Sequence, residues 1–287
     1  MVNEYYRLAK PGMVYGNLLT TIAAFLFASG WQNLYARSFV FLATVVGLSL
    51  VIASACVFNN YLDRDMDKNM ERTKNRALVT GIITPTSALV YGSLLGISGY
   101  LPLYFFANAL TAYVAAFGWF AYVVLYSIAK RGSSHGALVG SVSVGVPIVV
   151  GYTAVTGQLD YVALLLFVIL ALWQMPHFYA IALYRMDDYK KAGVPVLPIQ
   201  KGIQRTKIEI VVYMFLYLCA AASLTVFGFA GITYLAVVSV FGLLWLIRSS
   251  IGFTTADDTS WAKRLFLFSL VVLSTFSLAL AFSPLFP

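Results

Sequence analysis

The chain has 287 residues, of which 61% are hydrophobic and only 10% are charged, and its formal net charge is +8. A mean hydropathy of +0.83 excludes a soluble protein of two domains and indicates a polytopic membrane protein. The positive charge requires no nucleic-acid partner, because membrane proteins concentrate Lys and Arg in their cytoplasmic loops.

A membrane-spanning helix needs about 20 apolar residues, and the charge-poor runs supply about nine such helices. We therefore expect a single polytopic membrane domain over residues 1–287, an all-α integral membrane bundle around a central cavity open to the cytoplasmic side. The expected spans are 13–31, 38–60, 85–106, 109–128, 137–156, 161–183, 208–229, 231–248 and 264–283.

The distribution of basic residues predicts the orientation. With nine spans, all of the 19 Lys and Arg except Arg37 fall on one side, which places the N-terminus and the motif loops 59–84 and 184–207 in the cytoplasm and the C-terminus opposite. Arg7 and Lys10 before an apolar stretch also fit a secretory signal, but cleavage would remove a span and upset this balance. The lack of an Arg-rich, acid-poor transit peptide favours a bacterial plasma (inner) membrane.

Small and polar residues within the spans are interpreted first as packing groups. Asn17 lies in the first span, where a buried amide needs a partner; a bond to a neighbouring helix is favoured over a place in a polar site. Gly136 and Gly140 form a GxxxG pair in the fifth span, which predicts close helix approach, and Pro147 predicts a kink.

The most polar stretch follows the second expected span and reads NNYLDRDMDKNMERTKNR over residues 59–76. If the helix continues through it, Asn59, Asp63 and Asp67 fall within an arc of about 80° on one face. Such oxygen ligands suit Mg²⁺, which completes its shell with water and substrate phosphate oxygens. The alternative is a solvated loop that is basic for topological reasons alone.

Basic residues accompany these acids. Lys68, Arg72 and Arg76 follow in the same stretch, and such cations bind phosphate oxygens, so the stretch resembles half of a diphosphate site. Lys130 and Arg131 end the fourth expected span. A basic pair there also complements the helix dipole and marks the cytoplasmic side, so a diphosphate contact and a topological role are both open for this pair.

A second polar centre closes the sixth expected span, WQMPHFYAIALYRMDDYKKAGVPVLP over residues 173–198. Beyond Pro176, the residues His177, Tyr184 and Asp188 fall within about 40° on one face. An ionisable residue inside a membrane indicates a functional site, with a structural His bonded to a neighbouring helix as the alternative.

Asp187 and Asp188 are expected at the depth of the first acidic stretch, because the second and sixth spans both end at the cytoplasmic surface. Two acidic clusters would then face one cavity. They could hold one or two Mg²⁺ ions that bridge a diphosphate and make it a better leaving group. Phe, Tyr and Trp side chains in the cavity would shelter an allylic cation from water.

Three stretches, YRLAKPG at 6–12 and the two segments quoted above, resemble a known family. The chain resembles the intramembrane aromatic prenyltransferase superfamily and, within it, the protohaem IX farnesyltransferases (haem O synthases), over its whole length. The resemblance implies transfer of a farnesyl group from farnesyl diphosphate to a vinyl group of haem B with Mg²⁺ as cofactor. It also implies the lipid bilayer as surroundings and a haem A synthase or terminal oxidase assembly as a partner.

Carried over by residue, the resemblance assigns Asn59, Asp63, Asp67 and Asp188 to catalysis and to Mg²⁺. It assigns phosphate contacts to Lys68, Arg72, Arg76, Lys130 and Arg131, and it places His177 on the haem side. From the second polar centre, Tyr184 and Asp187 are also expected to bind substrate. One departure is that the second motif of the superfamily is commonly DxxxD, whereas position 184 is Tyr here and the acids are adjacent. The number of metal ions is therefore open.

Two other functions fit parts of the pattern. The first is the same fold acting on a quinone-precursor aromatic acceptor. The second is a secondary transporter, whose ion-carrying acids lie near the bilayer midplane, whereas Asp63, Asp67 and Asp188 are expected at a cytoplasmic mouth.

Overall fold

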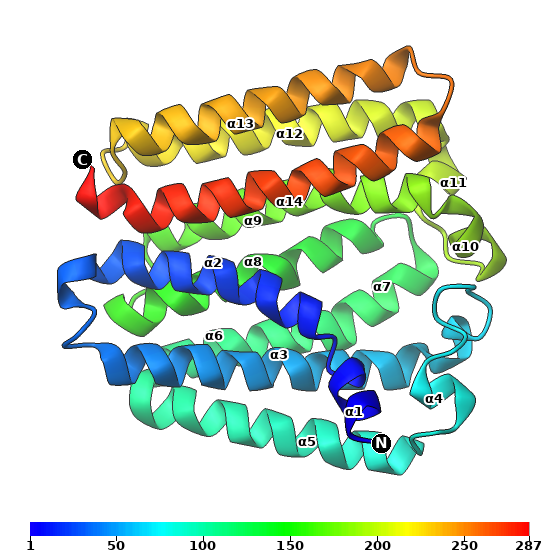
Figure 1. Ribbon diagram of the computed structural model, residues 1–287, viewed down its shortest axis with the longest axis horizontal. Coiled ribbons are helices and arrows are strands. Elements are labelled where there is room, and N and C mark those ends of the chain that lie inside the picture. The colour runs from blue at the N-terminus through cyan, green and yellow to red at the C-terminus, as the bar shows by residue number, and fades with distance from the viewer. Residues whose placement is uncertain (287) are drawn as a thin grey trace.

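The computed structural model describes residues 1–286, and every regular element in that part of the chain is helical (Figure 1). The α-helices are α1 Val2–Leu8, α2 Pro11–Ser29, α3 Ser38–Asp67, α4 Ala77–Thr80, α5 Pro85–Pro102, α6 Ala109–Phe120, α7 Ser127–Gly132, α8 Gly136–Thr156, α9 Tyr161–Tyr184, α10 Met186–Lys191, α11 Leu197–Lys201, α12 Ile203–Val226, α13 Ile232–Ser250 and α14 Asp258–Phe282. Two π-helical segments, η2 Leu103–Ala107 and η3 Ala121–Tyr126, extend α5 and α6. Short 3₁₀ turns are η1 Trp31–Asn33, η4 Ile251–Phe253 and η5 Ser283–Leu285.

Nine helical segments between residues 1 and 286 are long and apolar enough to cross a membrane, which confirms the number expected from the sequence. The chain is therefore a multi-pass membrane protein. Their bounds are Pro11–Ser29, Ser38–Asp67, Pro85–Ala107, Ala109–Gly132, Gly136–Thr156, Tyr161–Tyr184, Ile203–Val226, Ile232–Phe253 and Asp258–Leu285.

Helix α3 is longer than the membrane requires. It has 30 residues, which at 1.5 Å per residue makes about 45 Å, against about 30 Å of hydrocarbon. The helix does not stop at residue 60 but continues to Asp67, so residues 59–67 of the expected 59–84 loop are helix. This continuation confirms the condition on which the stripe of Asn59, Asp63 and Asp67 depends.

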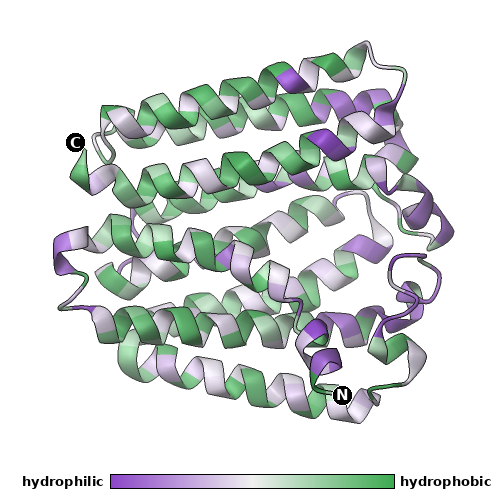
Figure 2. Ribbon diagram, in the orientation of Figure 1, coloured by the Kyte–Doolittle hydropathy of each residue, from purple (hydrophilic) through white to green (hydrophobic). Residues whose placement is uncertain are grey.

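Hydrophilic residues gather where α3 ends and α9 runs into α10 (Figure 2). We call this the basic end, because it holds the segments 64–76, 130–131 and 185–207. The N-terminus lies toward this end and the C-terminus lies at the other (Figure 1). The two termini are thus at opposite ends of the bundle, as an odd number of spans requires.

Two clusters of buried apolar residues hold the helices together. The larger cluster is shared by α2, α8, α9, α12, α13 and α14. The second cluster is shared by α3, η2, α6 and α8, so α8 contributes to both. Glycines allow the close approach that was predicted: a Cβ on Gly140 would lie 2.9 Å from the Phe178 ring, and one on Gly136 2.7 Å from Lys130 Cα.

The outer faces of the peripheral helices are apolar. Leu94 on α5, Phe117 on α6, Phe215 on α12 and Leu243 on α13 are each at least half exposed. Lipid tails can cover such a surface where water could not, because the bilayer interior is as apolar as these side chains. The polar chemistry of the protein is consequently confined to the basic end and to its interior.

Candidate active site

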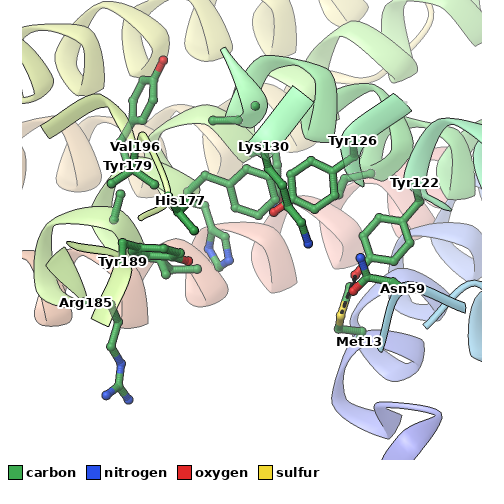
Figure 3. Close-up of a pocket in the computed structure, with 18 of the residues that line it drawn as sticks. Met13, Asn59, Tyr122, Tyr126, Lys130, His177, Tyr179, Arg185, Tyr189 and Val196 are labelled. Carbon is green, nitrogen blue, oxygen red and sulfur yellow. Dashed lines mark hydrogen bonds between the residues drawn. The ribbon is translucent and has the colours of Figure 1, made fainter. Parts of the chain in front are cut away.

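A cavity of about 680 Å³ lies at the basic end, bounded by α2, α3, η3, α7, α8, α9 and α14. Its mouth is formed by the segment after α3 and by residues 185–197 after α9. Figure 3 shows Tyr126 and Lys130 between His177 on one side and Tyr122 with Asn59 on the other. The cavity therefore joins the two polar centres found in the sequence.

The stripe on α3 forms one wall of this cavity. Asn59, Asp63 and Asp67 all line it, and they are only 2%, 6% and 4% exposed. Spacing by four residues places them on one helical face at three successive turns. A buried carboxylate needs a partner, because the loss of its hydration costs several kcal/mol.

Each member of the stripe has a cationic partner. Lys10 Nζ donates to Asn59 Oδ1 over 2.8 Å, and the Tyr122 hydroxyl donates to the same oxygen over 3.3 Å. Asp63 forms a close ion pair with Lys130. Asp67 accepts a 2.5 Å bond from Arg76 Nη1. The wall is thus a row of acceptors matched by three cations.

Lys10 owes its position to an unusual backbone. It has φ 51° and is the one non-glycine residue within 1–286 with positive φ, a conformation that costs about 1–3 kcal/mol. This turn between α1 and α2 directs the side chain to Asn59. Burial lowers the pKa of the Lys10 ammonium to about 8, since a low-dielectric interior disfavours the charged form.

A row of aromatic rings crosses the cavity from this wall. Tyr122 stacks on Tyr126 with ring centroids 5.7 Å apart, and Tyr126 stacks on Phe178 at 6.3 Å. Lys130 Nζ lies 5.2 Å above the Tyr126 ring. Tyr122 and Tyr126 belong to the π-helical segment η3, and π turns are frequent at functional sites. The rings present π faces to the cavity, which attract a cation.

His177 ends this row on α9. Its ring stacks on Trp173 at 4.8 Å and lies 4.9 Å from Phe266. The Nδ1 atom is within 2.7 Å of Ser269 Oγ on α14, so His177 has the bond to a neighbouring helix that the structural interpretation requires. It also lines the cavity, as the functional interpretation requires. One ring nitrogen is therefore held by α14 while the residue still faces the site.

The donor set on α3 fits a hard divalent cation. Two carboxylates and an amide are the kind of ligands that Mg²⁺ takes beside water and substrate phosphate. Asp63 Oδ1 is buried without a hydrogen-bond partner, so it could act as a ligand without breaking a bond. No group of three His, Cys, Asp or Glu side chains converges within residues 1–286. An ion on this wall would take its remaining ligands from water and substrate phosphate, as Mg²⁺ commonly does.

The predicted site residues divide into two groups. Those that line the cavity are Asn59, Asp63, Asp67, Arg72, Arg76, Lys130, His177 and Tyr184; those that do not are Lys68, Arg131, Asp187 and Asp188. Lys68 pairs with Asp65 at the surface, over 2.8 Å. Arg131 donates to the Leu62 carbonyl oxygen and lies 3.8 Å from Asp63.

The second acidic pair lies at the predicted end of the bundle but outside the cavity. Asp187 is exposed on α10. Asp188 pairs with Arg185 Nη1 over 3.8 Å, and it is Arg185 that lines the mouth. The role of Asp188 as a metal ligand stays a prediction.

Several lining residues were missed as site residues: Lys10, Tyr122, Tyr126, Gln174 and Tyr189. A signal for two of them exists in the sequence, since Tyr122, Tyr126 and Lys130 are spaced by four and so share a helical face. Lys10 was interpreted only as a basic residue that precedes the first span and belongs to the stretch 6–12. Its left-handed backbone, which aims it inward, has no signature in the local sequence, because such a φ is usually found at Gly.

The chain matches a described family and close relatives. The sequence profile of the UbiA prenyltransferase family matches residues 17–271. A protoheme IX farnesyltransferase from Yersinia pseudotuberculosis (strain IP 31758) is 47% identical over 282 residues, which are 98% of this chain and 95% of that protein. A protoheme IX farnesyltransferase from Photorhabdus laumondii is 46% identical over 288 residues, covering 100% and 97%.

Solved structures share the fold. A structure described as a digeranylgeranylglyceryl phosphate synthase in membranes has a TM-score of 0.79 at 19% identity, covering 99% of this chain and 98% of that one. A UbiA homolog from Archaeoglobus fulgidus, bound to GPP and Mg²⁺, has a TM-score of 0.69 at 15% identity and covers 96% and 99%. The overall fold is therefore similar in these proteins.

Proposed function

This chain belongs to the UbiA prenyltransferase family, and from that premise we propose that it transfers a farnesyl group from farnesyl diphosphate to a vinyl group of haem B, forming haem O. The single observation that carries the proposal is the cavity itself. It joins an acidic and basic wall suited to a diphosphate to an aromatic wall that ends at His177. The two farnesyltransferases from Yersinia and Photorhabdus support the choice of donor and acceptor through their identity over nearly the whole chain.

The donor half lies along α3. We assign the diphosphate to the space beside Asn59, Asp63 and Asp67, where Lys10, Lys130 and Arg76 already supply positive charge. Arg72 lines the mouth, and none of the acids within residues 1–286 lies within ion-pair distance of it. Its guanidinium is therefore available to bind phosphate oxygens in a two-pronged contact.

The α3 stripe would hold Mg²⁺, which as a Lewis acid withdraws charge from the phosphate oxygens and makes diphosphate a better leaving group. The UbiA homolog bound to GPP and Mg²⁺ supports this assignment. Lys10, Lys130 and Arg76 must release the stripe for this to happen, and each ammonium or guanidinium can turn to the diphosphate instead. The hydrogen bonds that these three side chains now make to the stripe would then be made to the departing diphosphate, which carries the negative charge.

The acceptor half lies along α9 and α14. Gln174 and His177 are one helical turn apart on α9 and both line the cavity. We place the macrocycle here, on the cavity side of the Trp173–His177 stack and Phe178. Because Nδ1 of His177 is bonded to Ser269, Nε2 is the nitrogen that could reach the haem iron.

The reaction breaks the bond between C1 of the farnesyl group and the diphosphate oxygen. The vinyl π electrons then form the new carbon–carbon bond, and the cation left beside the porphyrin ring accepts water, which loses a proton. The row Tyr122, Tyr126, Phe178 lies between the two halves and offers π faces to the allylic cation. Exclusion of bulk water from this row protects the cation from premature capture.

We further propose that the basic end faces the bacterial cytoplasm, because cytoplasmic loops carry the excess of Lys and Arg. The cavity would then open to the cytoplasm, where a soluble diphosphate is available. The product would leave in the membrane, where a haem A synthase or terminal oxidase assembly could accept it.

The test is incubation of the purified protein with haem B, farnesyl diphosphate and Mg²⁺, followed by mass analysis of the extracted haem, with EDTA as control. We expect a product heavier by a farnesyl group plus a hydroxyl group, formed only with Mg²⁺. Unchanged haem together with prenylated 4-hydroxybenzoate would replace the acceptor by a quinone precursor. Intact diphosphate with every acceptor would contradict the proposal and leave transport as the function to test.

A further inference from the structure

A narrow crevice of about 50 Å³ lies beside the active-site cavity, toward the middle of the bundle. Met13, Asn17, Tyr122 and Val144 line both spaces, so the two are adjacent and share a wall in which the Tyr122 hydroxyl lies 3.8 Å from Met13 Sδ. The crevice runs between α2, α3, the α6–η3 helix and α8, and no charged side chain lines it. It adjoins the cavity on the side of the α3 stripe, and His177 does not line it.

The depth of the crevice can be measured along α3. Cys56, Ile52 and Leu48 line it on the helical face that continues the stripe beyond Asn59. From Asn59 to Leu48 the helix rises about 16 Å. An extended hydrocarbon chain advances about 1.2 Å per bond, so the chain from C1 to C12 of a farnesyl group spans about 13 Å and that of a geranylgeranyl group about 18 Å.

The crevice has a closed floor. Leu48 and Val146 belong to a packed cluster with Leu103 and Val150, and Leu48 is only 2% exposed. Its walls are fixed as well, because Trp119 Nε1 donates to Ser54 Oγ over 3.2 Å. At the narrow part, a Cβ on Gly118 would lie 2.7 Å from Val146 Cγ1. A group that enters the crevice therefore stops at Leu48 unless the floor is opened.

The remaining apolar part of the cavity lies elsewhere. Leu170, Leu270 and Leu273 line it on α9 and α14, beside Trp173 and His177. A macrocyclic acceptor needs that space under the function proposed above. An allylic diphosphate held on α3 thus has one direction left for its hydrocarbon tail.

We propose that this crevice receives the distal end of the prenyl donor and that Leu48, with Val146, sets the length of donor that the enzyme accepts. The inference rests on the proposed function, which supplies both the prenyl diphosphate donor and the macrocyclic acceptor that takes up the rest of the cavity. A tail of three isoprene units ends just above Leu48. A tail of four meets the floor and cannot place its diphosphate beside Asn59 and Asp63.

The test measures dissociation constants, so that it does not depend on the acceptor. The probes are the thiodiphosphates of geraniol, farnesol and geranylgeraniol, which resist ionisation, bound to the purified protein with Mg²⁺. Leu48→Ala should raise the affinity for the geranylgeranyl probe relative to the farnesyl probe about tenfold, by opening the floor. Ile52→Phe, about 10 Å from Asn59 along α3, should favour the geranyl probe by a similar factor.

Leu224→Ala is the matched control, because Leu224 on α12 is fully buried but lines neither space. Its three affinities should keep the wild-type ratios. If Leu48→Ala does not fold, the affinity ratios of Ile52→Phe alone test the inference, because this variant fills the crevice and leaves no cavity in the core. Ratios unchanged in the folded variants would overturn the inference and leave the proposed function intact. A wild-type protein that binds none of the probes would overturn the proposed function itself.

Discussion

The two acidic segments of this protein look equivalent in sequence and differ in space. Asp63 and Asp67 on α3 are buried in the cavity wall, each beside a cation. Asp187 and Asp188 on α10 lie at the same end of the bundle but outside the cavity lining. The first pair sits on a continuous helix that is longer than the membrane. The second pair follows a helix that has already ended at Tyr184.

The difference lies in which carboxylates are placed to face a substrate inside the cavity. A carboxylate can be buried only where cations and hydrogen bonds replace its water, and the α3 wall supplies Lys130 and Arg76 for that purpose. The α10 segment supplies only Arg185, at 3.8 Å from a partly exposed Asp188. The comparison supports the proposal that α3 forms the metal and diphosphate wall and that α10 only borders the mouth.

The largest effect is expected from Asp63→Asn. The change keeps the shape of the side chain but removes a charge and leaves Lys130 buried without its partner. Activity should fall on the order of a thousandfold, measured as kcat for haem prenylation. Asp65→Asn is the matched control, because Asp65 is exposed and pairs with Lys68 at the surface. A loss of equal size in both variants would contradict the assignment of the wall.

The second effect concerns the other end of the aromatic row. His177→Ala should raise KM for haem about tenfold and leave KM for farnesyl diphosphate unchanged, because His177 lies on the acceptor side. The absorption spectrum of bound haem should change if Nε2 reaches the iron. His135→Ala is the control, since His135 is exposed outside the cavity. An unchanged haem spectrum in His177→Ala would exclude iron ligation.

A smaller effect is expected from Asp188→Asn. The carboxylate steadies Arg185 at the mouth, and a partly exposed pair of this kind contributes up to about 1 kcal/mol, or about fivefold in KM for the donor. The resemblance to the family assigns Asp188 to the metal instead. In that case Asp188→Asn would be as damaging as Asp63→Asn, and steady-state kinetics of the two variants would show it.

The smallest effect is expected from Lys68→Ala. The ammonium pairs with Asp65 outside the cavity, and exposed pairs are screened by solvent. Donor KM should stay within about twofold of wild type. A tenfold rise would show that Lys68 turns inward when diphosphate binds, and the donor half would then extend beyond the α3 wall.

Much of the fold could be predicted from the sequence, because apolar runs of spanning length are a strong signal. The helical stripe of Asn59, Asp63 and Asp67 could be predicted too, since regular spacing determines a shared face. The position of Asp188 outside the cavity lining could not, because the turn at Arg185 breaks the register after α9. Nor could the inward position of Lys10 be predicted. It depends on one left-handed residue and on a contact with α3 that is 49 positions away in the chain.

The central claim is that α3, and not α10, holds the metal. It is tested most directly by titrating Mn²⁺, as a paramagnetic substitute for Mg²⁺, into the wild-type protein with bound farnesyl thiodiphosphate and recording the EPR signal of the free ion. The same titration follows for Asp63→Asn and Asp188→Asn. We predict that tight binding is lost in Asp63→Asn and retained in Asp188→Asn. Retention in Asp63→Asn, or loss of equal size in both, would contradict the account.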